Sequence, residues 1–139
     1  RKIDTSSPIN RYDFKNAVTA VNFHPTLPCR FVTTCYDDTV RIFDAQGEVA
    51  VIPHNNQTGR WITLFKAIWD PKSTTLEDSV IAIGNMENRG VDLFEGGKGE
   101  WVECATGEWL TAQPAVNAIH NSLPVMVSGN ASGKIVIWS

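Results

Sequence analysis

An internal repeat constrains the fold of this chain more than any other feature of the sequence. Three segments follow one order: a short apolar strand, a turn, a second strand, a tight turn and a third strand. They lie within residues 18–44, 64–95 and 116–139. Each third strand ends on an aromatic residue, namely Phe43, Phe94 and Trp138. Repeats of about 40–50 residues with four strands each are typical of the blades of a β-propeller.

Fourth strands are expected after the first two repeats, in residues 47–54 and 99–105. The strands are rich in Val, Ile and Thr and alternate with period two in places, whereas no segment keeps a 3.6-residue period. We therefore predict an all-β protein, a partial β-propeller of about three four-stranded blades. The predicted blades span residues 17–54, 62–105 and 114–139. Propellers typically close with about four to eight blades, and the sequence starts at Arg1 rather than Met, so we expect a fragment of a larger protein.

The composition and charge exclude several classes of protein. The 139 residues suffice for one modest domain, and no window approaches the roughly 20 apolar residues of a membrane helix. No basic region followed by an apolar stretch opens the sequence, so we expect no secretory signal. The three cysteines, Cys29, Cys35 and Cys104, have neither the paired spacing of a zinc site nor the even number of a disulfide scaffold. We predict no metal, no cofactor, no membrane partner and no small-molecule substrate, and the formal charge of −3 restricts any nucleic-acid site to a local basic patch.

A repeated hexamer supplies the candidate site. Residues 58–63 read TGRWIT and residues 106–111 read TGEWLT, and both follow the fourth strand of a blade, where the chain crosses the top face of a propeller. Packing explains most of the motif: Thr-Gly forms a turn, Trp61 and Trp109 pack on the neighbouring blade, and the following Ile or Leu starts the next strand. Packing does not explain why the third position changes from Arg60 to a glutamate.

The first hexamer belongs to a polar and basic sector that suits DNA. The preceding loop, residues 54–58, is rich in side chains that reach bases or phosphates. An arginine beside a tryptophan clamps a phosphate while the ring stacks on a base or wedges between base steps. Lys66 follows shortly after, and Arg89 lies in the next turn on the same predicted face. The predicted DNA-binding residues are Asn56, Gln57, Arg60, Trp61, Lys66 and Arg89.

The ends of the third strands resemble a known repeat. TVRIFD at residues 39–44 resembles the strand end of WD40 repeats, and Asp37 stands where those repeats carry an aspartate in the preceding turn. Asn88 and Ser132 occupy the place of this aspartate in the other two repeats, and Trp138 stands at the position of the repeat's tryptophan. The resemblance implies a WD40 β-propeller, in which the Asp37 carboxylate caps backbone N–H groups of its turn.

A narrower resemblance extends from about residue 18 to the end of the chain. The runs IPHNNQTGRWITLFKAIWDP (52–71), IAIGNMENRGVDLF (81–94) and GNASGKIVIW (129–138) resemble the damaged-DNA-binding branch of WD40 proteins, which holds the small subunit of the UV-damaged DNA-binding complex and the WD repeat-containing protein 76 family. The resemblance implies a non-catalytic nuclear protein that binds duplex DNA in the damage response or in chromatin. The lesion wedge of that subunit falls on Gly59, Arg60 and Trp61, where the wedge residues are absent, so lesion-specific binding does not follow.

The resemblance leaves other binding functions open. Many WD40 proteins of this branch are substrate receptors of a cullin-4 ubiquitin ligase, and they dock on its adaptor through a Trp-Asp-x-Arg step. Residues 43–46 and 94–97 lack the arginine of that step, whereas Arg1 stands where the end of a preceding blade would place it. A further alternative is a histone or peptide reader on the top face, anchored by Trp61 and Trp109.

The residues that resemble catalytic groups have structural explanations. His24 and His120 occupy equivalent repeat positions at a strand end, which predicts a hydrogen-bonding structural role. The glycine-rich run at 96–99 lacks the spacing of a phosphate-binding loop and precedes no helix, so we expect a hairpin. No serine, histidine and aspartate share the spacing of a nucleophile elbow. We therefore predict no catalytic residues and no enzymatic activity.

Overall fold

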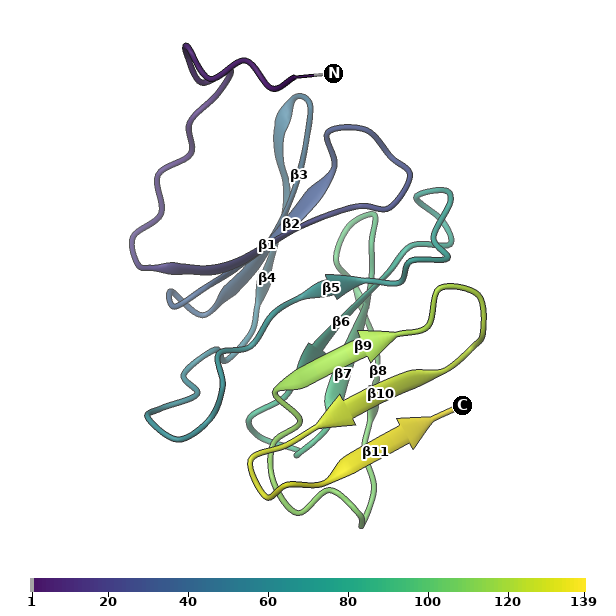
Figure 1. Cartoon of the computed structure of the whole chain (residues 1–139). Coiled ribbons are helices and arrows are strands. Elements are labelled where there is room, and N and C mark those ends of the chain that lie inside the picture. The colour runs from purple at the N-terminus through teal and green to yellow at the C-terminus, as the bar shows by residue number, and fades with distance from the viewer. Residues whose placement is uncertain (1) are drawn as a thin grey trace.

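The computed structural model describes residues 2–139, and three antiparallel sheets account for the strands β1–β11 of this range (Figure 1). The first sheet has the order β1 (Val18–Phe23), β2 (Phe31–Cys35), β3 (Thr39–Asp44) and β4 (Gly47–Pro53). The second has the order β5 (Ile68–Trp69), β6 (Val80–Gly84), β7 (Val91–Glu95) and β8 (Trp101–Ala105). The third contains β9 (Val116–Ile119), β10 (Met126–Gly129) and β11 (Ile135–Trp138).

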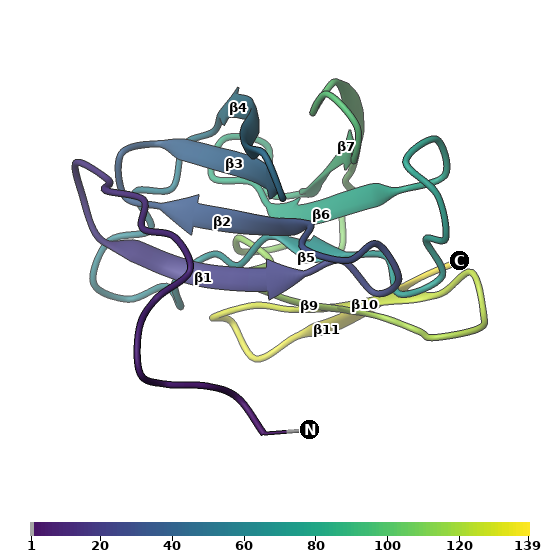
Figure 2. The same ribbon diagram turned by 90° about the horizontal axis from the view of Figure 1, so that it is seen from above.

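These sheets confirm the predicted all-β architecture of three propeller-like blades, which do not close a ring in the described residues. The second sheet lies between the first and the third (Figures 1 and 2). The third sheet has three strands within the described residues, so β11 is an edge strand. The described part of the chain contains no helix that is both long and apolar enough to cross a membrane.

Strand β5 is shorter than the sequence pattern predicts. The pattern starts this strand at residue 64, whereas β5 begins at Ile68. The backbone N–H of Ala67 donates instead to the Thr34 hydroxyl of the first sheet at 2.9 Å. Phe65 and Ala67 are thereby buried between the two sheets. The segment between β4 and β5 is therefore held against the first sheet up to Ala67, and the second sheet begins directly after it.

Two hydrophobic clusters hold the sheets together. Ile81 and Ile83 of β6 face the first sheet, in a cluster completed by Val32, Val40, Ile42, Ile52, Phe65, Ala67, Trp69, Phe94 and Ala115. The intervening Ala82 faces the third sheet, where it packs with Val91 and Met126. Successive side chains of a strand point to opposite faces, so a continuous apolar β6 suits a sheet that is covered on both sides. Burying each of these larger side chains stabilises the fold by about 1.5–3 kcal/mol.

The first strands of the first and third sheets, β1 and β9, lead into equivalent turns on the face away from the linkers. The His24 Nδ1 atom accepts the backbone N–H groups of Thr26 and Leu27 at 3.2 and 2.9 Å. The His120 Nδ1 atom accepts those of the two residues at 122 and 123, both at 3.1 Å. This confirms the structural role that the sequence predicts for the two histidines.

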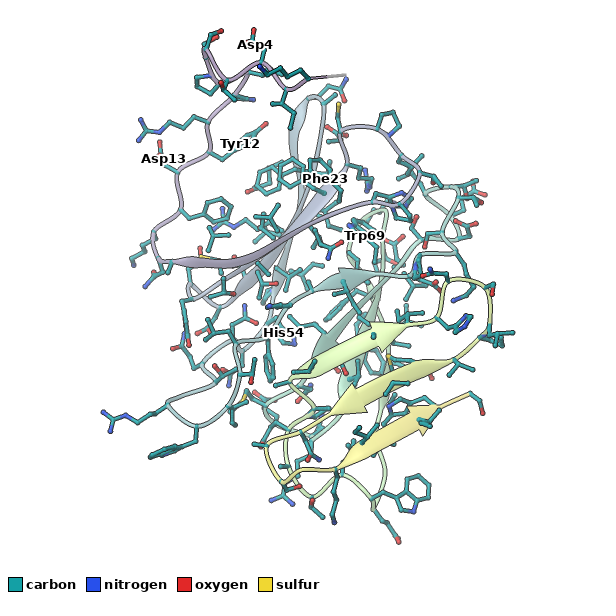
Figure 3. The ribbon with its side chains drawn as sticks, in the orientation of Figure 1. Asp4, Tyr12, Asp13, Phe23, His54 and Trp69 are labelled. Carbon is teal, nitrogen blue, oxygen red and sulfur yellow. The ribbon has the colours of Figure 1, made fainter. Side chains whose placement is uncertain are left out.

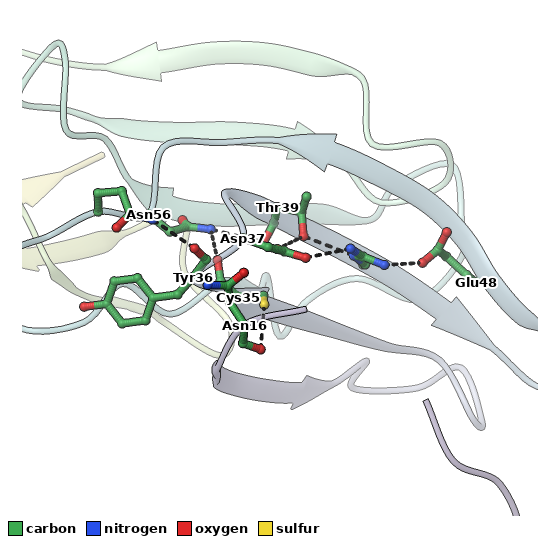
Figure 4. A network of polar contacts seen from close by, with 9 residues as sticks. Asn16, Cys35, Tyr36, Asp37, Thr39, Glu48 and Asn56 are labelled. Atoms are coloured by element: carbon green, nitrogen blue, oxygen red, sulfur yellow. Dashed lines mark hydrogen bonds and ion pairs between the residues drawn. The ribbon is translucent and has the colours of Figure 1, made fainter. Parts of the chain in front are cut away.

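The carboxylate of Asp37 has side-chain partners rather than the backbone partners expected from the resemblance (Figure 4). Its oxygens accept hydrogen bonds from the Thr39 hydroxyl at 2.5 Å and from Arg41 Nη2 at 2.7 Å. Arg41 also donates to Glu48 at 3.0 Å. The neighbouring Asp38 accepts the backbone N–H of Asn56, which lies in the linker after β4, at 2.9 Å. The expected capping role of Asp37 is therefore wrong, because its carboxylate points along β3 toward Arg41.

Asparagines hold the corresponding turns of the second and third sheets. The Asn85 side-chain oxygen accepts the N–H groups of Glu87 and Asn88 at 2.7 and 2.8 Å. The Asn130 oxygen accepts that of Ser132 at 3.1 Å. The capping residue is therefore the first of each turn, and the equivalence that the resemblance assigns to Asn88 and Ser132 does not extend to the capping role.

Candidate nucleic-acid interface

The two hexamers lie on one face of the molecule, which we call the linker face. It comprises the turns at 36–38, 85–90 and 130–134 and the linkers at 54–67 and 106–115. Side-chain hydrogen bonds join turns to linkers across the face: Tyr36 to Thr58 at 3.3 Å, Thr106 to the Asn88 carbonyl at 3.2 Å, and Thr111 to Ser132 at 2.7 Å. In Figure 1 the linker between β4 and β5 projects away from the sheets as a teal loop at the lower left.

The first hexamer is anchored at both ends and exposed in the middle. Thr58 is buried and its N–H donates to the Asn56 carbonyl at 2.9 Å, and Ile62 packs against the main core. Gly59 between them has a φ of 68°, the left-handed conformation that glycine adopts without strain. Arg60 and Trp61 therefore form the exposed tip of a supported turn.

The tryptophans do not pack on neighbouring blades as predicted. Trp61 is 84% exposed and Trp109 is 69% exposed. A side chain at Gly107 would come within 2.7 Å of the Trp109 ring, so that ring folds back over its own turn. The apolar anchors of the two hexamers are the partly buried Ile62 and the buried Leu110. Neither starts the next strand as expected, because β5 and β9 begin further along the chain.

Asn56 is removed from the predicted DNA-binding set, because it is buried with only 3% of its surface exposed. Its Nδ2 atom donates to the carbonyl oxygens of Cys35 and Thr39 at 2.8 and 3.1 Å. Its Oδ1 atom lies 2.8 Å from His54 Nδ1, and its N–H donates to Asp38 at 2.9 Å. The residue therefore supports the linker from inside rather than facing a ligand.

Gln57 is exposed but partly engaged. Its Nε2 atom donates to the Tyr36 carbonyl at 2.9 Å and to Asp38 Oδ1 at 3.0 Å. Both hydrogens of the amide are thereby directed to the neighbouring turn, and the Oε1 atom is left to meet a ligand.

The three predicted cations are exposed on the linker face. Arg60, Lys66 and Arg89 form no hydrogen bond or ion pair with any residue from 2 to 139. Arg89 has a φ of 47°, an uncommon conformation for a residue other than glycine. A fourth exposed cation, Lys134, was not predicted, although it occupies the turn of the third repeat as Arg89 occupies that of the second.

Acidic and basic side chains occupy different parts of the linker face. A groove of about 590 Å³ between the first two sheets contains Asp38, Glu87 and Asp92 together with the exposed ring of Trp101. The lysines line two depressions beside the third sheet, of about 80 Å³ for Lys66 and about 350 Å³ for Lys134. The basic sector is therefore narrower than predicted, since acidic groups border it at the groove.

A buried histidine–aspartate contact links the first two sheets beneath this groove. His54 Nε2 lies 3.4 Å from Asp92 Oδ2, which also accepts a hydrogen bond from Asn85 Nδ2 at 2.6 Å. Figure 3 shows His54 in the interior of the molecule. Burial alone would raise the pKa of Asp92, but hydrogen bonds from His54, Asn85 and Cys104 outweigh burial and hold that pKa below its ordinary value. Sequence reasoning missed this pair, because its members are brought together only by the packing of two sheets.

The one buried serine–histidine contact among these residues cannot activate a nucleophile. His24 Nε2 lies 2.7 Å from Ser79 Oγ. Because His24 Nδ1 accepts two backbone N–H groups, the proton of the neutral ring resides on Nε2, which donates to Ser79. Ser79 in turn donates to the Thr75 carbonyl. A general base must accept the proton of the serine, and this arrangement runs in the opposite direction.

Comparison with known proteins agrees with the fold. The family model of the WD domain, G-beta repeat, matches residues 7–44. WD repeat-containing protein 76 of Mus musculus is 35% identical over 94% of this chain and 21% of its own length. DNA damage-binding protein CMR1 of Phaeosphaeria nodorum is 39% identical over 76% of this chain and 23% of its own length. The chain thus spans less than a quarter of each of these two relatives.

Among solved structures, the computationally designed Ika4 protein is 14% identical with a TM-score of 0.45, over 93% of this chain and 94% of that one. The matched repeat and the three sheets define the chain as a WD40-repeat protein. Within that class it is related to WD repeat-containing protein 76 and to the CMR1 DNA damage-binding proteins. The predicted adaptor-docking residue, Arg1, lies outside the described residues 2–139.

Proposed function

We propose that the linker face binds duplex DNA without catalysing a reaction, in the setting of DNA damage or chromatin. Arg60, Lys66 and Arg89 contact phosphates, and Trp61 lies at the groove or between base steps. The observation that carries the proposal is the exposed Arg60–Trp61 tip on a turn that the buried Thr58 and the partly buried Ile62 hold in place. A relative whose name is DNA damage-binding protein supports DNA as the partner.

The charges of Arg60, Lys66 and Arg89 are unpaired within residues 2–139. A guanidinium or ammonium group without an internal partner keeps its full charge for a phosphate, and its release of counterions favours binding. Trp61 is 84% exposed, and the stacking of a base on an aromatic ring contributes about 1–3 kcal/mol. The chain as a whole is acidic, so binding depends on this local sector and weakens steeply with salt.

A charge reversal tests the proposal. We expect Arg60→Glu, which writes the charge of the second hexamer into the first, to weaken binding of a fluorescent duplex by at least about tenfold. Lys98→Glu is the matched control, because Lys98 is also exposed but lies in the β7–β8 turn, outside the linker face. Equal affinities of Arg60→Glu and Lys98→Glu would refute the proposed site. Plain and UV-irradiated duplexes, compared in the same assay, measure any preference for damage.

A second candidate is a protein-interaction function, which the acidic groove favours. Asp38 and Glu87 beside the exposed Trp101 ring suit a cationic peptide, in which an arginine or lysine pairs with carboxylates and packs on the ring. A histone tail is one such cationic peptide. In this groove its aromatic contact would be Trp101, whereas the sequence analysis expected Trp61 and Trp109. Glu87→Lys separates the two functions, because it abolishes peptide binding and leaves DNA binding intact or strengthened.

Two further properties are proposed for the whole protein. The first is docking on the adaptor of a cullin-4 ubiquitin ligase, and the second is a location in the nucleus. Both come from the resemblance to the damage-binding branch, and both concern the whole protein. Co-precipitation of the full-length protein with the adaptor, with and without Arg1→Ala, tests the first. Fluorescence imaging of the tagged protein tests the second, and a purely cytoplasmic signal would contradict it.

A further inference from the structure

Two depressions on the linker face adjoin each other beside the third sheet. Thr63, Ala115 and Val116 line both of them. Lys66 lines the smaller depression, of about 80 Å³, and Lys134 lines the larger one, of about 350 Å³. The two depressions therefore form one trough with a lysine in each part, which we call the lysine trough.

The lysine trough differs in charge from the groove between the first two sheets. Within the described chain, no carboxylate lines either depression, whereas Asp38, Glu87 and Asp92 line that groove. The ammonium groups of Lys66 and Lys134 form no hydrogen bond or ion pair with any residue from 2 to 139. Both charges are therefore available to an anion, which the trough attracts and the groove repels.

The β10–β11 turn holds the backbone of Lys134 in place beside the trough. The Asn130 Oδ1 atom accepts the backbone N–H of Lys134 at 3.2 Å and that of Ser132 at 3.1 Å. Gly133 lies between them with a φ of 76°, and no atom beyond its chain neighbours lies within 4 Å of the place where a Cβ would be. A ligand can therefore approach the backbone of this turn closely, which a side chain at Gly133 would hinder.

The lysine trough begins where the first hexamer ends. Thr63 is the last residue of TGRWIT, and Arg60 and Lys66 lie on either side of it in the same linker. The β4–β5 linker and the β10–β11 turn lie on the same side of the molecule in both views of the ribbon (Figures 1 and 2). The trough therefore continues the exposed Arg60–Trp61 tip toward the third sheet.

Exposed apolar side chains accompany the two lysines. Val116 at the start of β9 is 57% exposed, and Ile135 at the start of β11 is also exposed. Both line the trough. A nucleic-acid strand alternates anionic phosphates with the less polar faces of its sugars, so the lysines suit the phosphates and the apolar walls suit the sugars.

We propose that the lysine trough binds the sugar–phosphate backbone of DNA, so that the strand met by Arg60 continues past Lys66 to Lys134 on the third sheet. The inference rests on the proposed DNA-binding function and adds a contact beyond the residues assigned to it. Lys134 takes a phosphate, and Val116 lies beneath the strand where the two depressions adjoin. The acidic groove borders the opposite side of the path and keeps the backbone away from the first two sheets.

The first test compares Lys134→Glu with Lys98→Glu in the full-length protein, by binding of a fluorescent duplex. Both variants replace an exposed turn lysine by glutamate and change the net charge equally. We expect Lys134→Glu to bind at least about threefold more weakly than Lys98→Glu, and Lys134→Ala to lower the magnitude of the salt slope by about 0.9. Equal affinities of the two glutamate variants would overturn the proposed trough.

A gain of affinity provides a second test that loss of folding cannot mimic. Val116→Lys adds a cation where the two depressions adjoin, and we expect it to strengthen duplex binding by at least about threefold. Val102→Lys is the matched control, because Val102 is 49% exposed in β8 and lines neither depression. An equal gain in both variants would show a general effect of charge and contradict the proposal.

Arg60→Glu in the same assay separates this inference from the proposed function. If Arg60→Glu weakens binding and Lys134→Glu does not, the trough is refuted and DNA binding by the tip stands. If only Lys134→Glu weakens binding, the trough stands and the role of Arg60 is refuted.

Two further outcomes would overturn the inference. If neither Arg60→Glu nor Lys134→Glu differs from Lys98→Glu, the proposed function fails together with the trough. A polyglutamate peptide that binds through Lys134, with duplex affinity unchanged in Lys134→Glu, would assign the trough to an acidic protein segment instead of DNA.

Discussion

The Arg30 guanidinium at the start of β2 donates through Nη2 to the Gly96 carbonyl oxygen at the end of β7, at 2.6 Å. A second bond from the same nitrogen reaches the Gly97 carbonyl at 2.9 Å. These bonds tie the first two sheets together on the side away from the linkers, while His54 and Asp92 meet nearer the linker face. The relative position of Arg60 and Arg89 therefore depends on contacts at both ends of the sheets.

Removal of the Arg30 side chain should loosen this connection. Arg30 is buried, and two hydrogen bonds from a charged donor are lost in Arg30→Ala. We expect the free energy of unfolding to fall by about 3 kcal/mol in thermal or chemical denaturation. Arg11→Ala provides the control, because Arg11 is exposed and forms only a surface pair with Asp13. Equal losses in both variants would show that Arg30 contributes no more than a surface residue.

Asn56 and Gln57 are neighbours with opposite expected effects. Asn56→Ala leaves two buried carbonyl groups and His54 without their partner, so we expect a loss of about 2 kcal/mol in stability. Gln57→Ala should change stability by less than about 0.5 kcal/mol, because its contacts are exposed. Denaturation midpoints of the two variants check this contrast. A Gln57→Ala variant that is less stable than Asn56→Ala would contradict the assignment of Asn56 as the internal support.

The cysteines should differ sharply in reactivity. The pKa of Cys104 is raised to about 12 by burial and by the adjacent Asp92, and burial also raises the pKa of Cys35. Cys29 is exposed. Because the thiolate is the reactive form, iodoacetamide at about pH 8 should alkylate Cys29 rapidly and leave the other two intact. Mass spectrometry of the native protein counts the adducts, and Cys29→Ser should remove the rapid one.

Acid should destabilise the fold through its buried carboxylates. Burial opposes ionisation of Asp92, but hydrogen bonds from His54, Asn85 and Cys104 outweigh it, so the pKa lies below the ordinary 3.8. A lowered pKa in the folded state means that the stabilisation is complete at neutral pH and is lost as the pH falls through the folded value. We expect the melting temperature to drop below about pH 4, and less so in Asp92→Asn. An unchanged acid limb in that variant would exclude Asp92 as a cause.

The pattern of the strands predicts the fold because alternation of apolar residues is a local property. The repeated order of strands and turns predicts three sheets, and the structure contains these three sheets. Local pattern fails where long-range contacts decide the outcome. Asn56 is polar and was expected at the surface, yet backbone carbonyls from the β2–β3 region draw it inside. Trp61 and Trp109 are apolar and were expected to pack, yet their turns hold them outside.

The candidate site was predictable in part for the same reason. Exposed cations in loops, such as Arg60 and Lys66, are recognised from composition and position in the repeat. The acidic groove and the pair of His54 and Asp92 are not, because residues far apart in the sequence meet only when the first two sheets pack.

The salt dependence of DNA binding measures how many phosphates the linker face contacts. Each phosphate contact contributes about 0.9 to the slope of log affinity against log salt concentration. Replacing Arg60, Lys66 and Arg89 together by alanine should lower the magnitude of this slope by about 2.7 relative to the wild type, while Lys98→Ala should leave it unchanged. A triple variant with the wild-type slope would contradict the claim that the linker face binds the DNA backbone.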